Sequence, residues 1–227
     1  MKILIVVNVD WYFWSHRLPL AKALRARGCE VVVVAAEERG YRRRIEGEGF
    51  RFVPLRLRRG SRNVATEWQT FADLLRIYRR ESPALVHHVS IKPILYGSMA
   101  ARLARRPPVI NAVTGLGYAF LPEVRQSWTG RAAAILYRLA CAGGRTLVLC
   151  QSPDDRDALV ARGIVPRERT AIVRGSGVNV DEFTATPEPA GTPVLLISGR
   201  MLWVDALKFF EHIHPFDHAT KSGVLSV

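Results

Sequence analysis

Short β-branched apolar runs alternate with helical segments along most of this chain, at a spacing of about 20 to 30 residues. Such runs occupy residues 3–7, 31–35, 84–88 and 146–150. A continuous apolar run is typical of a strand that is buried on both faces of a parallel sheet. We therefore expect an α/β fold, namely a doubly wound, Rossmann-like parallel sheet.

Helix signals separate these runs. The first expected helix covers residues 15–27, where Ser15 can cap the start and Gly28 stands at the end. Ser152 and Gly163 bracket another in the same way. The further helices are expected at residues 64–81, 94–104, 130–142 and 153–162, and short strands at 52–55, 109–112 and 170–173.

Ligands of doubly wound sheets bind beyond the carboxyl ends of the strands. That rule selects residues 8–16, 87–93, 111–120 and 175–179. The turn after the first strand contains bulky aromatic residues and no glycine, and no P-loop is present. We therefore expect no classical NAD or ATP site, because both need a glycine-rich phosphate loop.

The net charge of +13 comes almost entirely from arginine, and many arginines lie between Arg39 and Arg80. One interpretation is a solvated arginine-rich surface. A second is a surface that contacts anionic lipid headgroups or a lipid-linked phosphate. Nucleic-acid binding ranks last, because no zinc-finger, RNA-recognition or helix-turn-helix signature accompanies the charge.

The three cysteines, Cys29, Cys141 and Cys150, have no metal-ligand spacing and cannot all pair with one another. Buried free thiols in a reducing compartment are expected. The apolar N-terminus predicts a strand rather than a signal peptide, and no apolar run reaches the roughly 18 residues that span a bilayer. We expect a cytoplasmic protein that at most lies on the inner face of the cytoplasmic membrane.

The composition changes near residue 184. We expect a domain at residues 1–184, a linker at 185–193 and the start of a second domain at 194–227. No arginine follows Arg200, and three of the six histidines lie in the last 27 residues, at His212, His214 and His218. A tail that is read out of frame, or that comes from a rearranged gene, would explain this change.

Three ordered stretches carry a family resemblance. They are Trp14-Ser15-His16-Arg17-Leu18-Pro19, then His87-His88-Val89-Ser90-Ile91-Lys92-Pro93 with Val113-Thr114-Gly115-Leu116-Gly117, and finally Gly175-Ser176-Gly177-Val178-Asn179 with Ser198-Gly199-Arg200. Together they resemble bacterial family 4 glycosyltransferases of the two-domain GT-B fold. The similarity is closest to enzymes that extend glycans on polyprenyl-diphosphate carriers.

The resemblance implies transfer of a sugar from a nucleotide-sugar donor to a lipid-linked or polysaccharide acceptor, with retention at the anomeric carbon. The N-terminal domain would hold the acceptor. No metal ion or other cofactor is expected. Such chemistry needs cations and aligned N–H groups to stabilise charge on the departing diphosphate.

The candidate catalytic residue is His87, which ends a predicted strand and can face the sugar; the alternative is a hydrogen-bonded structural histidine. His88 is expected to point to the opposite face and to be structural. Lys92 can meet a phosphate or an acidic acceptor group, or be a solvated lysine. His16 and Arg17 begin the first expected helix, where free N–H groups would help Arg17 to attract phosphate; a plain surface role for Arg17 is the alternative.

The remaining candidates are loop residues. Gly115 and Gly117 allow a loop that approaches a ligand or simply a tight turn, and Gly175 and Gly177 are expected near the donor phosphates. Trp11, Tyr12, Phe13 and Trp14 form either an apolar ledge for a lipid-linked acceptor or part of the core. The family resemblance assigns Arg200 to the donor diphosphate.

The sequence departs from the family pattern after Arg200. Asp205 stands where the resemblance calls for lysine, and few residues follow it for a donor-binding domain. Two alternatives to a glycosyltransferase therefore remain. One is a non-catalytic acceptor-binding remnant, and the other is a GT-B-like nucleotide-sugar epimerase.

Overall fold

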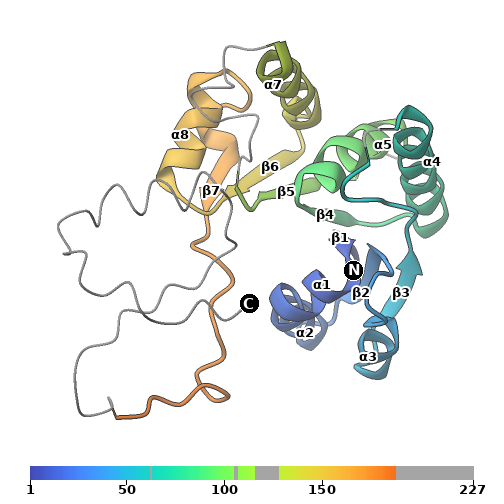
Figure 1. The fold of residues 1–227 in the computed structure, drawn as a ribbon, viewed down its shortest axis with the longest axis vertical. Coiled ribbons are helices and arrows are strands. Elements are labelled where there is room, and N and C mark those ends of the chain that lie inside the picture. Colours follow the sequence, from blue (N-terminus) through green and yellow to red (C-terminus); the bar gives the residue numbers. More distant parts are fainter. Residues whose placement is uncertain (62, 105–106, 116–127, 188–227) are drawn as a thin grey trace, which may run out of the picture. The chain divides into compact units, whose positions relative to one another are not determined.

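The computed structural model describes residues 1–61, 63–104, 107–115 and 128–187 of the chain (Figure 1). Contacts divide the chain into one unit at Met1–Asn179 and another at Val180–Val227. The start of the second domain, expected at residues 194–227, lies outside the described residues, as does the histidine-rich tail.

The described part of the first unit contains a seven-stranded sheet in which every neighbouring pair is parallel. The strand order is β3-β2-β1-β4-β5-β6-β7. The strands are β1 (Lys2–Val9), β2 (Glu30–Ala36), β3 (Arg51–Pro54), β4 (Leu85–Val89), β5 (Val109–Val113), β6 (Thr146–Cys150) and β7 (Thr170–Ile172). This topology confirms the doubly wound α/β prediction. The winding direction reverses between β1 and β4, which is where such sheets bind ligands.

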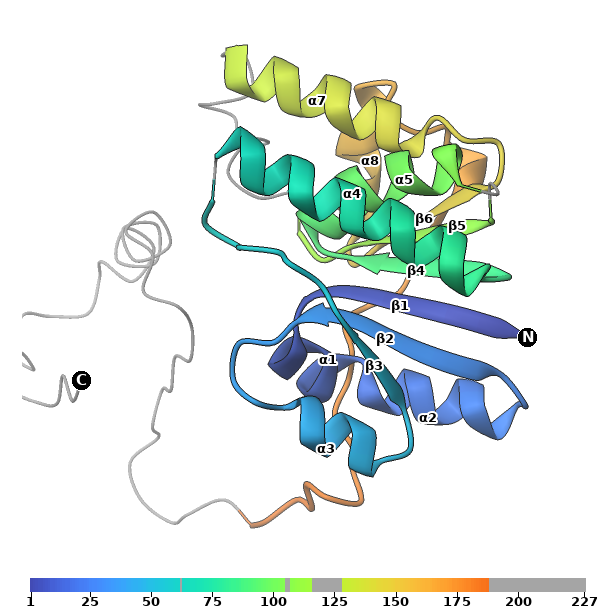
Figure 2. The same cartoon turned by 90° about the vertical axis from the view of Figure 1, so that its right-hand side faces the viewer.

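Helices cover both faces of the sheet (Figure 2). One face carries α1 (Asp10–His16), α2 (Leu18–Ala26) and α3 (Arg42–Gly47). The other carries α4 (Val64–Glu81), α5 (Ser98–Leu103) and α7 (Trp128–Cys141). The remaining helical segments are a π-helical turn at Pro93–Gly97, α8 (Pro153–Ala161), which packs on β6 and β7, and a 3-10 turn at Arg167–Arg169.

Strand alternation divides the apolar side chains between the two faces. Leu4 and Val6 of β1 pack with Leu74 and Tyr78 of α4, whereas Ile5 packs with residues of the α1–α3 face. A third cluster joins β6 to α7 and α8. The central strands are buried on both faces, as their continuous apolar runs predicted.

The boundaries expected for two helices agree with the structure to within one residue. Asn63 Oδ1 accepts the Ala65 N–H at the start of α4, which ends at Ser82 in the left-handed region. Ser152 caps α8 as predicted, with its Oγ accepting the Asp155 N–H at 3.0 Å. Cys141 and Cys150 are buried, Cys29 is half-buried, and all three thiols are free.

The start of the first helix was predicted wrongly. The chain is already helical from Asp10, and the helix is interrupted at Arg17. The Asp10 carboxylate is fully buried and accepts the N–H of Tyr41 at 2.9 Å and of Glu38 at 3.2 Å. The loop after β2 is thereby fixed to the start of α1. Ser15 does not cap this helix, because it is the sixth residue of α1 and its Oγ donates to Trp11 O in the preceding turn.

Two further helical segments differ from the predictions. The helix α3, in the arginine-rich segment, was not predicted. The helix expected at residues 94–104 begins instead as the π-helical turn Pro93–Gly97. Gly97 is required there, because a Cβ would clash with His88 Nε2 and lie 2.9 Å from Tyr78 Oη.

Candidate functional site

A cavity of about 190 Å³ lies at the carboxyl ends of β4, β5, β6 and β7. The junction between α1 and α2 contributes Arg17 and Leu20 to its wall. Its other lining residues are His87, Ala112, Val113, Thr114, Leu149, Cys150, Gln151, Val173 and Gly175. The fold therefore brings three predicted site residues together, His87, Arg17 and Gly175, although the last is 158 positions from Arg17 in the sequence.

His87 follows the alternation of β4 and faces the α1–α2 side of the sheet, where only 7% of its surface is exposed. Burial above all, with smaller contributions from the nearby Arg17 and His88, lowers the pKa of His87 to about 3. The imidazole is therefore neutral at pH 7. No described residue hydrogen-bonds to its ring, so both nitrogens can face a ligand in the cavity, one as donor and the other as acceptor.

Arg17 supplies the positive charge of this cavity. One guanidinium nitrogen donates to His16 O at 3.2 Å and to Ser176 Oγ at 3.1 Å. Arg17 Nε is buried and has no hydrogen-bond partner among the described residues. Burial lowers the pKa of Arg17, but a guanidinium group stays charged at neutral pH. A buried donor without a partner carries a desolvation cost that an anionic ligand would offset.

His16 lies outside the cavity lining. It is the last residue of α1, and its ring stacks on Tyr12 with centroids 4.3 Å apart. Its Nδ1 lies 2.6 Å from Ser15 Oγ, and burial followed by the Arg17 charge lowers its pKa. The expectation that His16 and Arg17 begin a helix is wrong, since the Arg17 N–H is bonded to Phe13 O within α1.

The glycines adopt conformations that other residues avoid. Gly115 follows β5 with φ +129°, and Gly175 and Gly177 follow β7 with φ +66° each. Gly175 lines the cavity. Gly117 and Arg200, the two other predicted binding residues, lie outside the described residues.

Lys92 has a different setting from either alternative proposed for it. Its Nζ donates to Arg58 O at 2.6 Å, Ser61 O at 2.9 Å and Glu67 Oε1 at 2.6 Å. An ammonium group has three donors, and all three are used within the chain. Lys92 therefore fastens the loop after β3 to α4 and has no free donor for a phosphate.

His88 points to the opposite face of β4 and is fully buried. Its Nδ1 lies 2.8 Å from Asn111 Oδ1, and its Nε2 lies 2.8 Å from Tyr78 Oη. Because an amide oxygen only accepts, Nδ1 carries the proton and Nε2 accepts from the tyrosine. Burial lowers the pKa of His88 to about 4, so this ring is neutral as well.

Two polar residues of the cavity, Thr114 and Gln151, were not among the predicted site residues. Each stands directly after a strand, Thr114 after β5 and Gln151 after β6. A search of every carboxyl strand end would have found Gln151.

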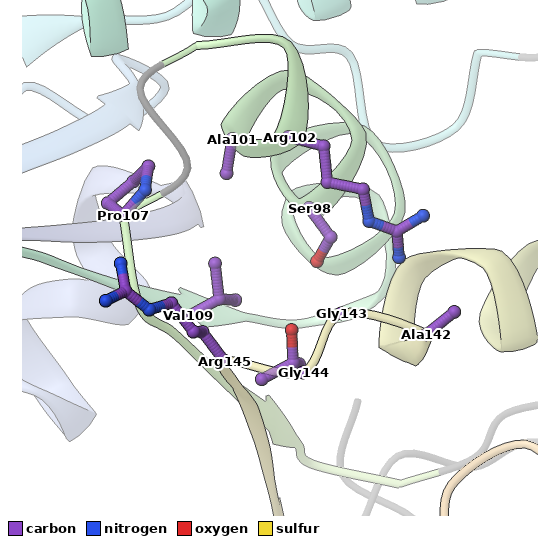
Figure 3. Close-up of a pocket in the computed structure, with 10 residues that line it drawn as sticks. Ser98, Ala101, Arg102, Pro107, Val109, Ala142, Gly143, Gly144 and Arg145 are labelled. Atoms are coloured by element: carbon purple, nitrogen blue, oxygen red, sulfur yellow. The ribbon is translucent and has the colours of Figure 1, made fainter.

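A larger cavity of about 420 Å³ lies at the other edge of the sheet (Figure 3). Val109 and Thr146, at the amino ends of β5 and β6, contribute to its wall together with Ser98 and Arg102 of α5. Its two arginines are Arg102 and Arg145, and Arg102 donates to the Leu139 carbonyl of α7. Its position opposite the ligand-binding edge of the sheet favours the smaller cavity as the candidate site.

Within the described residues, no group of three or more His, Cys, Asp or Glu side chains is placed to hold a metal ion. No helix in the same part of the chain is long and apolar enough to cross a membrane.

Comparison with known proteins supports this assignment of the fold. A curated N,N'-diacetylbacillosaminyl-diphospho-undecaprenol α-1,3-N-acetylgalactosaminyltransferase of Campylobacter jejuni is 20% identical over 225 residues, which cover 92% of this chain and 59% of that protein. A glycosyltransferase structure from Rickettsia africae superposes with a TM-score of 0.63 at 16% identity, over 93% of this chain and 58% of the other. A UDP-N-acetylglucosamine 2-epimerase structure from Rickettsia bellii superposes with a TM-score of 0.55 at 14% identity, over 82% of this chain and 52% of the other.

The chain thus spans between about half and three fifths of each of these proteins. The structural similarities show the shared GT-B domain architecture. The sequence profile of one family, described as Glycosyl transferase 4-like, matches residues 2–152, about two thirds of the chain. The chain therefore belongs to the glycosyl transferase 4-like family.

Proposed function

We propose that this chain is the acceptor-side part of a retaining glycosyltransferase that transfers a sugar from a nucleotide-sugar donor to a lipid-linked acceptor. The observation that carries the proposal is the cavity in which the neutral, buried His87 lies beside the half-buried cation Arg17. The Campylobacter relative acts on a diphospho-undecaprenol substrate, as its name states, and this favours the same class of acceptor here.

The two side chains suit different parts of the reaction. A neutral imidazole can hydrogen-bond a sugar hydroxyl without competing for the diphosphate charge. Arg17 can stabilise the charge that develops on the departing diphosphate, and its unpartnered Nε offers a donor for this. Gly175 lets the backbone after β7 approach the same space. The proposed reaction needs no metal ion.

Sugar transfer is the direct test. The chain is incubated with labelled UDP- and GDP-sugars and with short-chain polyprenyl-diphosphate-linked sugars, and label in the lipid product is counted. We expect transfer that His87→Ala lowers by about 100-fold. Arg17→Met is expected to cause a similar loss, whereas Arg79→Met, which removes the same charge from the end of α4, leaves the rate within twofold. Epimerisation of the nucleotide sugar without transfer would favour the epimerase alternative. Acceptor binding without either reaction would favour the non-catalytic alternative.

We also propose that the α4–α5 face lies against an anionic membrane surface. An apolar groove of about 500 Å³ runs between these helices, with Trp68 67% exposed and Val64 82% exposed. Leu103 on α5 lines the same groove and is exposed as well. Exposed aromatic and aliphatic groups of this kind match the interfacial zone of a bilayer.

The charges beside the groove complement an anionic lipid surface. The carboxylates of α4 are in ion pairs, Glu67 with Lys92, Asp73 with Arg56 and Arg76, and Glu81 with Lys2 and Arg51. The charged residues of α5 and α7 are all arginines. This leaves a basic surface around an apolar groove.

Flotation with phosphatidylglycerol vesicles tests the membrane proposal. We expect the chain to float at low salt, and Val64→Glu/Trp68→Glu to remain at the bottom of the gradient. Ala23→Glu/Ala26→Glu adds the same charge to exposed positions of α2 and should still float. Equal loss in both double variants would reject the groove as the contact, and a concentration-dependent dimer that buries Trp68 would indicate self-association instead.

A further inference from the structure

Two arginines share one indole ring at the carboxyl edge of the sheet, away from the His87 cavity. Trp11 follows β1, Arg39 follows β2 and Arg59 follows β3. The guanidinium carbon of Arg39 lies 5.1 Å from the centroid of the Trp11 ring, and that of Arg59 lies 5.5 Å from it. We call these three residues the Trp11 platform. Each cation is attracted to the ring face, but the two also repel each other.

The backbone under Arg39 is held by a buried charge. The Asp10 carboxylate, which is 0% exposed, accepts the N–H of Arg39 at 3.3 Å and the N–H groups of Glu38 and Tyr41 on either side. The loop after β2 is therefore fixed before any ligand arrives. Preorganisation of this kind lowers the entropy cost of binding.

The backbone under Arg59 is held from the other direction. Lys92 Nζ donates to the carbonyls of Arg58 and Ser61, which flank Arg59. Lys92 thus positions the loop that carries Arg59. The indole is fixed too, since Trp11 Nε1 donates to Glu38 Oε2 at 2.8 Å.

The positive charge of the platform is only partly compensated. Glu38 Oε2 is 4.0 Å from Arg59, the outer limit of an ion pair, and is already engaged by the indole. The Arg39 guanidinium makes no ion pair with any described residue. Two guanidinium groups that lie over one indole ring without full compensation suit an anion with several oxygens, such as a phosphate, which arginine binds through paired N–H···O hydrogen bonds.

We propose that Trp11, Arg39 and Arg59 form a binding site for a phosphate or diphosphate group, separate from the His87 cavity. The site stands on its own geometry. Its assignment to the diphosphate of the acceptor's lipid carrier rests on the proposed function. Under that assignment the β1–β3 half of the edge holds the carrier phosphates, while the β4–β7 half holds the reacting sugars.

Calorimetric binding to the wild-type chain tests the site without any need for sugar transfer. The probes are inorganic pyrophosphate, farnesyl diphosphate and UDP, each at low ionic strength. We expect Arg39→Gln/Arg59→Gln to raise the Kd for pyrophosphate at least tenfold. The matched control is Arg42→Gln/Arg44→Gln on α3, which removes the same charge from arginines that also lie over aromatic rings and should change the Kd less than twofold.

Each outcome decides something. Equal weakening in both double variants, or no pyrophosphate and no farnesyl diphosphate binding to the wild-type chain, would overturn the site. Farnesyl diphosphate binding that depends on Arg39 and Arg59, with UDP binding unchanged, would assign the site to a lipid-linked diphosphate. Loss of UDP binding alone would assign it to a nucleotide and overturn the lipid assignment. His87→Gln should leave pyrophosphate binding unchanged, because His87 lies outside the Trp11 platform. The binding test therefore stays valid even if the chain transfers no sugar.

Discussion

His87 and His88 are adjacent on β4, yet they occupy opposite faces of the sheet and different chemical settings. His88 is bonded through both ring nitrogens to Asn111 and Tyr78. His87 lines a cavity and has no hydrogen-bond partner among the described residues. Both are buried and neutral, so burial alone does not distinguish a structural histidine from a ligand-facing one. The number of satisfied ring nitrogens does, because buried polar groups of the core are normally paired.

The largest expected effect comes from removing the paired histidine. His88→Ala would open a cavity and remove the partner of Tyr78 Oη and one of the two partners of Asn111 Oδ1, which also accepts from Ser98 Oγ. We expect the free energy of unfolding at pH 7 to fall by about 3 to 4 kcal/mol. Urea denaturation measures it. A loss below about 1 kcal/mol would mean that the network does not stabilise the fold.

Acid should act on both histidines. Their pKa values in the folded chain, about 3 for His87 and about 4 for His88, lie below the usual value of 6.5. The unfolded chain therefore binds more protons, and stability falls as the pH drops below about 6.5. Each histidine contributes a loss of roughly 2 kcal/mol between pH 7 and pH 5.

A variant separates the two contributions to the acid effect. His87→Gln removes the histidine that lines the cavity, so the unfolding free energy of this variant should fall between pH 7 and pH 5 by roughly 2 kcal/mol less than that of the wild-type chain. Denaturation curves at the two pH values provide the comparison. Identical pH dependence in the two proteins would show that His87 is not desolvated.

Lys92 extends the same contrast to a cation. Like His88, it has no free hydrogen-bonding group, and Lys92→Met would leave Glu67 and two loop carbonyls without their donor. We expect a loss of about 1 to 2 kcal/mol in the free energy of unfolding. An unchanged stability together with weaker acceptor binding would favour the original ligand role for Lys92.

The smallest expected effect on stability comes from replacing His87, the histidine that lines the cavity. At pH 7, His87→Gln removes no hydrogen bond to a described residue and nearly preserves side-chain volume. The unfolding free energy should change by less than about 0.5 kcal/mol. A loss as large as that of His88→Ala would remove the distinction between the two histidines.

The sequence predicted the sheet well and the site in part, for physical reasons. Strands 31–35 and 146–150 were evident because a β-branched run buried on both faces has few alternative structures. Alternation along the strand likewise separated His87 from His88. The early start of α1 was missed, since it depends on Asp10 bonding to a loop about 30 residues away. The role of Lys92 was missed for the same reason, because its partners lie 25 to 34 residues earlier.

The measurement that tests the central claim most directly is imidazole NMR of the chain, with His87 and His88 assigned from His87→Gln and His88→Gln. A short-chain polyprenyl-diphosphate-linked sugar and a nucleotide sugar are titrated in turn. Our account predicts that the His87 ring resonances shift on ligand binding, and that those of His88 move little. Binding detected by calorimetry with no change at His87, or with changes at His88 alone, would contradict it.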